Sequence, residues 1–325
     1  MREIPDELMH GPFTLERALA LGLSREVVNG PRFRTPWRWV RVLRDRPDTL
    51  EQRCRAASLV LPESAVFSHD TAVALGEWLV PRVDGRPSRK YVPRSVIPDV
   101  LLHVSVPSHL PRPVGSGVVG HRFEPSVEDV GLVDGLRVTS PWRTWCDLAA
   151  AGAEDTDLVI LADALRRRSP GAGARLLTER LDSWGSGRGA RALRRALARS
   201  RDGVDSPMET RLRLLFADAG LPEPEVNQWV RLEDGTPVHK PDLSWPQWRV
   251  AADYDGVHHA ERDDEEDVRA GRGSDWRQRQ DNSRRDLMED ARWRLRVFTS
   301  FDVFRRPEVS VERMRGTLRE AGAPV

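Results

Sequence analysis

The chain has 325 residues, which is too long for one typical domain and long enough to bury two or three small cores. Lys and Arg number 51 and Asp and Glu number 50, so the formal net charge is +1. This balance excludes a polycation that would bind any polyanion. Any contact with nucleic acid must therefore be local, and we expect a modular protein.

The two cysteines, Cys54 and Cys146, lie far apart in the sequence and match no metal-knuckle spacing. Free, buried thiols in a reducing compartment are the plain interpretation. The amino terminus lacks the apolar run of a signal peptide, and no stretch approaches the ~20 apolar residues of a spanning helix. We therefore expect a cytoplasmic protein.

Residues 1–48 predict a winged-helix-like DNA-binding module. Thr14 and Ser24 can each cap a short helix, with Gly22 as the turn between them. The segment RFRTPWRWVRVL then alternates arginine with aromatic and aliphatic residues, as expected of a β-wing with one packed and one basic face.

Residues 49–157 predict an α+β middle domain. LEQRCRAASLVL, SHDTAVALGEWLV and PWRTWCDLAA have helical spacing, and DVLLHVSVP and GVVGHRF are strand-like. In GLVDGLRVTS the Asp134-Gly135 pair favours a type I′ hairpin turn. His69, His103 and His121 fall on different elements, so we expect no reactive cluster here and assign these histidines no role.

Residues 158–202 predict an arginine-rich helical connector. In RALRRALARSR the arginines surround the helix instead of following one stripe. A solvated connector and a helix that rests against phosphates are both compatible with this pattern.

Residues 203–325 carry the chemistry, beginning with a helix after the cap Ser206 with Pro207 at its first position. The apolar residues Met208, Leu212 and Phe216 share one face of this helix. Glu209 has two interpretations at this point: a capping-box glutamate, or an acid that faces a functional site.

Three further acids are expected on neighbouring strands. A hairpin through Glu233-Asp234-Gly235 leads to VHKPDLSW, which carries Asp242, and Pro246 turns the chain into RVAADYDG, which carries Asp253 and Asp255. Residues two apart on a strand share a face. Converging carboxylates repel each other unless a cation neutralises them, and hard oxygen ligands suit Mg²⁺ or Mn²⁺. The alternative is an exposed hairpin with solvated acids.

Histidines and arginines follow this strand. His258 and His259 come just beyond the acids, where an imidazole can transfer a proton near neutral pH. The segment ERDDEEDVRAGRGSD is charged and glycine-rich and predicts a flexible loop. QDNSRRDLMEDA then predicts a helix that leads into the strand WRLRVF.

The stretch from Ser206 to about Arg319 resembles the very-short-patch-repair-like endonuclease domains of the PD-(D/E)xK superfamily. The matching residues are Glu209, Pro241-Asp242, the run from Val250 to Gly256, His259, Asp281 with Arg284 or Arg285, and WRLRVF. The resemblance implies a restriction-endonuclease-like α/β/α domain with a mixed sheet, in which Asp242 and Asp253 hold the metal and Glu209 assists. Asp255 stands where the superfamily has lysine, Asp253 is shorter than the usual glutamate, and Lys240 is the nearest candidate to replace the lysine.

The segment HGPFTLERALALGLSREVV with the basic wing resembles the winged-helix start of the abortive-infection type IV antitoxin family. VDGLRVTSPWRTWCDLA resembles the region that follows it in actinobacterial chains of this two-part architecture. Those antitoxins are DNA-binding autorepressors, so the resemblance implies a targeting or regulatory front end.

The sequence therefore predicts a multi-domain α/β protein that acts as a Mg²⁺- or Mn²⁺-dependent DNA endonuclease or nicking enzyme. Asp242 and Asp253 would bind the metal, Asp255 and Glu209 would complete the acidic site, and His258 or His259 would move a proton. Arg284, Arg285 and Lys240 would contact the backbone phosphate of duplex DNA. The alternative is a DNA-binding regulator or antitoxin-like protein that keeps the fold without the chemistry, and RNA cleavage is a third possibility. The sequence identifies no partner toxin or methyltransferase.

Overall fold

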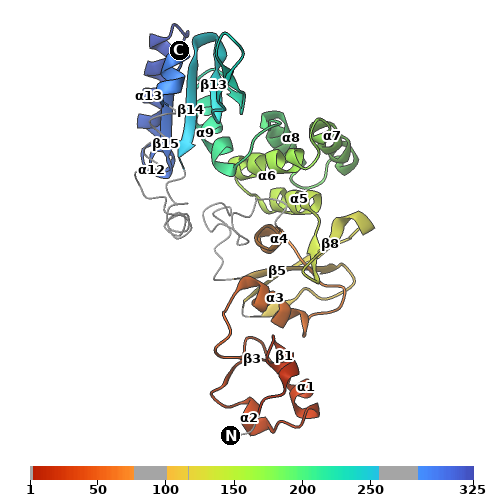
Figure 1. Cartoon of the computed structure of the whole chain (residues 1–325). Coiled ribbons are helices and arrows are strands. Elements are labelled where there is room, and N and C mark those ends of the chain that lie inside the picture. The colour runs from red at the N-terminus through yellow and green to blue at the C-terminus, as the bar shows by residue number, and fades with distance from the viewer. Residues whose placement is uncertain (1–2, 77–100, 116, 256–284) are drawn as a thin grey trace. The chain divides into compact units, whose positions relative to one another are not determined.

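The computed structural model describes residues 3–76, 101–115, 117–255 and 285–325 (Figure 1). The protein is a mixed α/β protein with several separate sheets, as predicted. Its residues group into two compact units, one of residues 1–153 and 186–193 and the other of residues 154–185 and 194–325. None of the helices among the described residues is both long enough and apolar enough to cross a membrane.

The first residues form a small sheet with two short helices. The helices begin at the predicted caps, since Thr14 Oγ1 accepts a hydrogen bond from Arg17 N at 3.1 Å and Ser24 Oγ accepts one from Val27 N at 3.3 Å. The sheet has the order β1-β3-β2. The elements are η1 (Asp6–Leu8), β1 (Phe13–Thr14), α1 (Leu15–Ala20), α2 (Arg25–Val28), β2 (Phe33–Arg34) and β3 (Val40–Leu43).

A six-stranded sheet with the order β6-β7-β5-β4-β9-β8 follows. Asp134 and Gly135 both have positive φ, 49° and 79°, as the predicted type I′ turn between β8 and β9 requires. The strands are β4 (Val66–Phe67), β5 (Leu102–Pro107), β6 (Val114–Gly115), β7 (Val118–Phe123), β8 (Val130–Val133) and β9 (Leu136–Thr139), and η2 (Val127–Asp129) precedes β8.

Three helices accompany this sheet: α3 (Leu50–Ser58), α4 (His69–Leu75) and α5 (Pro141–Ala151). They match the predicted helical segments, although α4 begins after Ser68 without a side-chain cap bond. Every residue of α4 is buried, including His69, Asp70 and Thr71. Buried polar residues need partners. His103 N donates to Thr71 Oγ1 at 2.8 Å and Asp70 Oδ2 lies 3.7 Å from His103 Nε2, while Ala72 and Leu75 pack in the apolar core.

Three further helices precede the carboxy-terminal sheet: α6 (Asp155–Arg167), α7 (Gly173–Trp184) and α8 (Ala190–Arg199). The expectation that arginines surround α8 without a stripe is wrong, because Ala190, Leu193 and Ala196 form a buried row. Arg195 and Arg199 pair with acids of the protein itself, Asp155 and Asp218.

The last sheet has the order β10-β13-β14-β15, and only the β14–β15 pair is parallel. Its strands are β10 (Glu225–Val226), β13 (Leu243–Trp245), β14 (Val250–Asp255) and β15 (Arg294–Thr299), while β11 (Val230–Arg231) and β12 (Pro237–His239) form a separate hairpin. Pro246 begins the turn η3 (Pro246–Trp248) before β14, as predicted.

The two strands predicted before this turn are each interrupted. VNQWVRL is divided between β10 and β11, because Asn227 between them has a left-handed φ of 52°. VHKPDLSW is divided between β12 and β13 at Pro241, which has no backbone N–H to continue a ladder.

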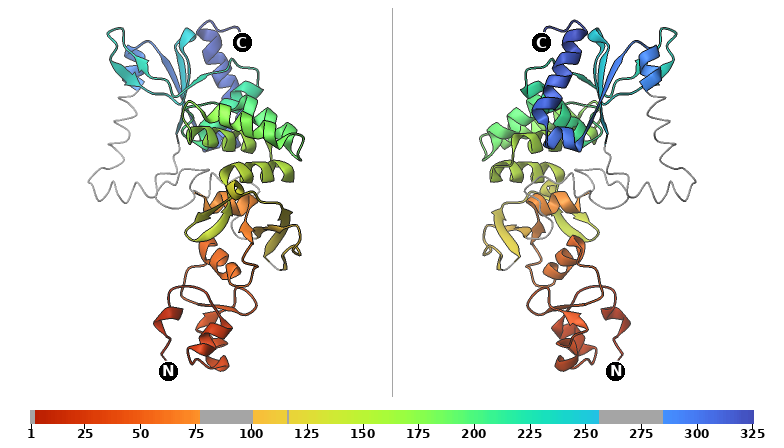
Figure 2. Two further views of the ribbon diagram at one scale, coloured as in Figure 1. Left: turned by 90° about the vertical axis from the view of Figure 1, so that its right-hand side faces the viewer. Right: turned by 90° about the vertical axis from the view of Figure 1, so that its left-hand side faces the viewer.

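Alternation along β14 gives the sheet two different faces. Val250, Ala252 and half-buried Tyr254 pack in the main core with helix α9 (Pro207–Asp218) and helix α13 (Pro307–Glu320). Figures 1 and 2 show α13 alongside this sheet. Ala251 packs on the other face with Val230 and Met288, the latter in a helical stretch over residues 285–290. The short helix α12 (Ser300–Phe304) follows β15.

Candidate functional site

Asp242, the residue directly before β13, lies opposite Asp253 of the neighbouring strand β14. Leu243 pairs with Ala252 in the antiparallel β13–β14 register, and one more step of this register sets Asp242 against Asp253. Asp242 N donates to Asp253 Oδ1 at 3.2 Å, and Tyr254 N donates to Asp242 Oδ2 at 2.6 Å. Directly opposed residues of an antiparallel pair share a face, so the structure brings these two predicted residues together.

The local sequence explains why a carboxylate is held here. Asp253 follows three apolar residues of β14 and is itself 6% exposed. Alternation puts it on the face of Ala251, away from the main core. A buried carboxylate is costly without partners, and the amide of Asp242 supplies one of them.

The sequence did not single out His239, which is another partner of Asp253. His239 Nε2 lies 2.7 Å from Asp253 Oδ2. It comes from β12, the last strand of the separate hairpin, and ends that strand just before Pro241. A carboxylate–imidazole contact fixes the orientation of both groups.

Glu209 is joined to the same region through Asn227. Asn227 Nδ2 donates to Glu209 Oε2 at 2.6 Å, and Asn227 N donates to Asp242 O at 3.1 Å. The Glu209 carboxylate also accepts a bond from Asp205 N at 2.9 Å, and Ser206 Oγ caps Glu209 N at 3.2 Å. Burial raises the pKa of the Glu209 carboxyl above its ordinary value, although these hydrogen bonds oppose the shift.

The capping-box interpretation of Glu209 is therefore confirmed for the Ser206 cap but not for the Glu209 side chain. Ser206 caps the helix, but the Glu209 carboxylate bonds to Asp205 N and Asn227. Asn227 is a residue that sequence reasoning missed. Its only local signal was that asparagine is one of the few side chains that tolerate a left-handed backbone.

Of the other predicted site residues, the structure describes Asp255, Lys240 and Arg285. Asp255 is exposed at the end of β14. Lys240 Nζ pairs with Asp205 Oδ2 at 3.2 Å, and Arg285 is exposed at the start of the 285–290 helical stretch. His258, His259, Arg284 and the predicted flexible loop lie outside the described residues.

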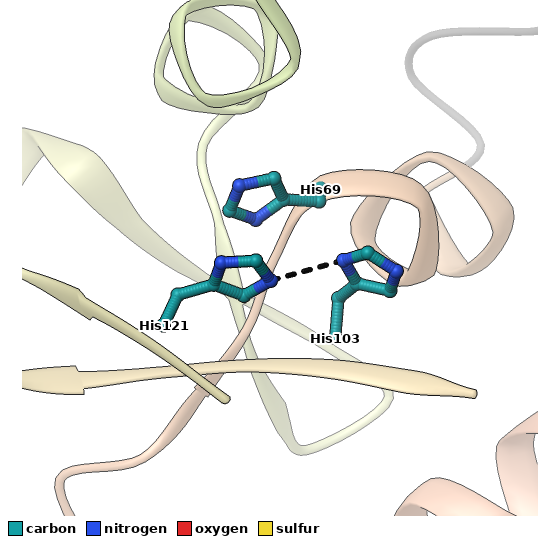
Figure 3. Close-up of side chains that lie close together, drawn as sticks. All are labelled: His69, His103 and His121. Atoms are coloured by element: carbon teal, nitrogen blue, oxygen red, sulfur yellow. Dashed lines mark hydrogen bonds between the residues drawn. The ribbon is translucent and has the colours of Figure 1, made fainter. Parts of the chain in front are cut away.

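A second cluster corrects the expectation that the middle domain has no group of reactive residues. His69, His103 and His121 fall on different elements, yet each offers a ring nitrogen within 4.8 Å of the others (Figure 3). Their separation in the sequence hid them, because the parallel β5–β7 pairing and the start of α4 bring them together.

No protein-family model, curated protein or solved structure matches this chain significantly. The two family resemblances therefore stay predictions.

Proposed function

We propose that residues 203–325 form a metal-dependent nuclease domain of the restriction-endonuclease-like class that hydrolyses phosphodiester bonds in DNA. The observation that carries this proposal is that Asp242 and Asp253 lie opposite each other where β13 and β14 pair. The carboxylate of Asp253 accepts a bond from the amide of Asp242, and the carboxylate of Asp242 accepts one from the amide of Tyr254. Two acids drawn to one face repel each other, and an oxygen-ligated divalent cation removes that repulsion.

The donor set fits Mg²⁺ or Mn²⁺. Both side chains offer hard carboxylate oxygens, and Mg²⁺ uses one or two carboxylates together with water and substrate phosphate. When bound, such an ion would polarise the scissile phosphate and acidify a water molecule.

The chain's own residues then have separate tasks. Asp242 and Asp253 hold the cation, and His239 orients Asp253 through its 2.7 Å contact. Asn227 fixes the backbone at Asp242 and the carboxylate of Glu209. Proton transfer by His258 or His259, and phosphate contact by Arg284 or Arg285, remain parts of the prediction.

The proposed DNA-binding front end depends on the turn between β2 and β3. Several arginines of the predicted wing serve the unit's own structure, since Arg34 pairs with Asp48 at 2.6 Å and Arg44 Nε donates to Pro31 O at 2.7 Å. Arg38 and Trp39 are both exposed at this turn, with the guanidinium 4.9 Å from the ring centroid. A cation stacked on an exposed indole suits contact with a nucleic acid, so we assign DNA contact to these two residues.

The second candidate is a DNA-binding protein without nuclease chemistry. The third position of the motif is Asp255 instead of lysine, and Lys240 is paired with Asp205. Both observations favour a domain that has lost the general base. This candidate predicts salt-sensitive DNA binding without metal-dependent scission.

A plasmid-nicking assay with purified full-length protein separates the two candidates. We expect conversion of supercoiled to open-circular DNA with Mg²⁺ or Mn²⁺ and none with a chelator. Asp242→Asn and Asp253→Asn should lose this activity, while Glu233→Gln, an exposed acid in the β11–β12 turn, should keep it. Equal nicking by all four proteins, or binding without nicking, would contradict the nuclease proposal. A parallel RNA substrate tests which sugar is accepted.

A further inference from the structure

Three histidines gather in the unit that contains the six-stranded sheet, far along the chain from the paired acids. His69 begins α4, His103 lies in β5 and His121 lies in β7 (Figure 3). His103 Nδ1 is 3.0 Å from His121 Nε2, and the rings of His69 and His121 are stacked with centroids 3.8 Å apart. One nitrogen from each ring lies within 4.8 Å of the others.

The backbone holds all three positions firmly. In the parallel β5–β7 pair His103 stands opposite Val119 and Ser105 stands opposite His121, so both imidazoles leave the same face of the sheet. His103 O accepts a bond from Ser68 N at 3.0 Å, which ties the residue before His69 to the strand that carries His103.

His69 adopts a backbone conformation that side chains rarely accept. Its φ is +50°, in the left-handed region, although glycine is the usual residue there. Such a conformation costs about 1–3 kcal/mol and is concentrated at functional sites. The contacts of the ring with Ser68 Oγ and with the stacked ring of His121 hold His69 in this conformation.

Further polar groups fix the orientation of the rings. Ser68 Oγ lies 2.9 Å from His69 Nδ1 and accepts a bond from Ser105 Oγ at 2.7 Å. Asp70 Oδ2 lies 3.7 Å from His103 Nε2. Metal-bound histidines commonly have such a hydroxyl or carboxylate on the second ring nitrogen. Nδ1 of His103 and Nε2 of His121 face each other, and a ring nitrogen of His69 lies within 4.8 Å of both.

We propose that His69, His103 and His121 bind a nitrogen-preferring divalent cation of the Zn²⁺ class. Zn²⁺ takes imidazole nitrogens at about 2.0–2.1 Å in a tetrahedral arrangement, which separates paired nitrogens by roughly 3.4 Å. The nitrogens of His103 and His121, 3.0 Å apart, are already close to this spacing. The His69 nitrogen lies within 4.8 Å of them, so it would have to move closer by at most roughly 1.4 Å when the ion binds. Three protein ligands leave one position for water or a substrate atom.

The surrounding charges are compatible with a cation. Arg143 lies near the cluster, but it pairs with Asp147 at 2.8 Å and with Asp129 at 3.6 Å, so its charge is balanced.

The site is tested in untagged full-length protein that carries Asp242→Asn and Asp253→Asn, so the acids of the proposed nuclease site cannot bind the probe. After removal of metal with a chelator, Zn²⁺ is titrated by calorimetry and Co²⁺ by absorption spectroscopy. We expect one equivalent of Zn²⁺ per chain and a Co²⁺ spectrum of a tetrahedral site with nitrogen ligands. No binding in this background would overturn the proposal and would leave the nuclease proposal untouched.

Variants then identify the ligands. His103→Ala and His121→Gln should each weaken Zn²⁺ binding by more than about 100-fold, and Asp70→Asn by roughly 10–100-fold. His109→Ala, an exposed histidine of the same unit, is the matched control and should bind as the parent does. Unchanged binding in the ligand variants would refute the assignment. If they fail to fold, X-ray absorption of the zinc-loaded parent decides: three imidazole nitrogens at about 2.0–2.1 Å support the site, and a sulfur or all-oxygen shell rejects it.

Discussion

The variant Asp253→Asn tests whether Asp253 binds a metal ion or only stabilises the fold. Asp253→Asn keeps the shape of the side chain, and its amide oxygen can still accept the bond from Asp242 N. The amide nitrogen can face His239 Nε2 in place of Oδ2. The main change is therefore the loss of one negative charge opposite Asp242.

Two opposing effects set the size of the change in stability. Directly opposed residues have Cβ atoms about 5 Å apart, and two charges about 5 Å apart at an effective dielectric constant of about 20 repel by roughly 3 kcal/mol. A hydrogen bond to a charged group is stronger than a neutral one by about 1 kcal/mol, so weakening two such bonds costs about 2 kcal/mol. Without metal, Asp253→Asn should therefore raise the free energy of unfolding by about 1 kcal/mol.

With metal bound, the wild type should instead be more stable than Asp253→Asn. A divalent cation at 100 times its dissociation constant adds about 2.7 kcal/mol to the free energy of unfolding of the wild type. The asparagine variant should gain little, because it has lost one ligand. Urea unfolding followed by circular dichroism, with a chelator and then with excess Mn²⁺, measures both values, and Glu233→Gln serves as the control.

The reasoning would be refuted if Asp253→Asn destabilised the metal-free protein by about 2 kcal/mol or more, since a carboxylate whose charge stabilises the fold has a structural role. It would also be refuted if wild type and variant gained equally from Mn²⁺.

Three further predictions concern neighbouring parts of the structure. Asn227→Gly keeps the left-handed backbone but removes the side-chain bond to Glu209. The free energy of unfolding should therefore fall by about 2 kcal/mol in urea titrations, and nicking should slow. An unchanged free energy of unfolding would show that Asn227 does not support the site. Burial raises the pKa of Asp163 from 3.8 to about 6, so the folded state holds this proton more tightly than the unfolded state. The free energy of unfolding should therefore fall by up to roughly 3 kcal/mol as the pH rises from about 4 to about 6. Asp163→Asn should flatten that part of the pH profile, and an identical slope in both proteins would contradict the burial argument. In Gly120→Ala the new methyl group would meet Pro113 O at 2.1 Å, so β6 and β7 must separate. Thermal melting should show that the free energy of unfolding falls by about 1–3 kcal/mol, and calorimetry should show weaker Zn²⁺ binding.

Local features were predictable from the sequence because short segments determine them. The caps Thr14, Ser24 and Ser206 bond to amides three residues ahead, and the turn at Asp134-Gly135 depends on two adjacent residues. The shared face of Asp253 and Asp255 was also predictable, because side chains alternate between the two faces along any strand.

Features that depend on contacts between distant segments were missed. The histidine cluster requires a parallel register between β5 and β7 and a link from Ser68 to β5, neither of which has a local signal. Likewise, His239 and Asn227 reach the acidic site only because Pro241 and the left-handed Asn227 interrupt what looked like continuous strands.

The most direct test of the central claim is a crystal structure of the full-length protein grown with Mn²⁺ and measured for anomalous scattering. The account predicts an anomalous peak between Asp242 and Asp253, within coordination distance, about 2 Å, of an oxygen from each. Well-ordered carboxylates that keep only their backbone and His239 contacts, with no peak between them at saturating Mn²⁺, would contradict it.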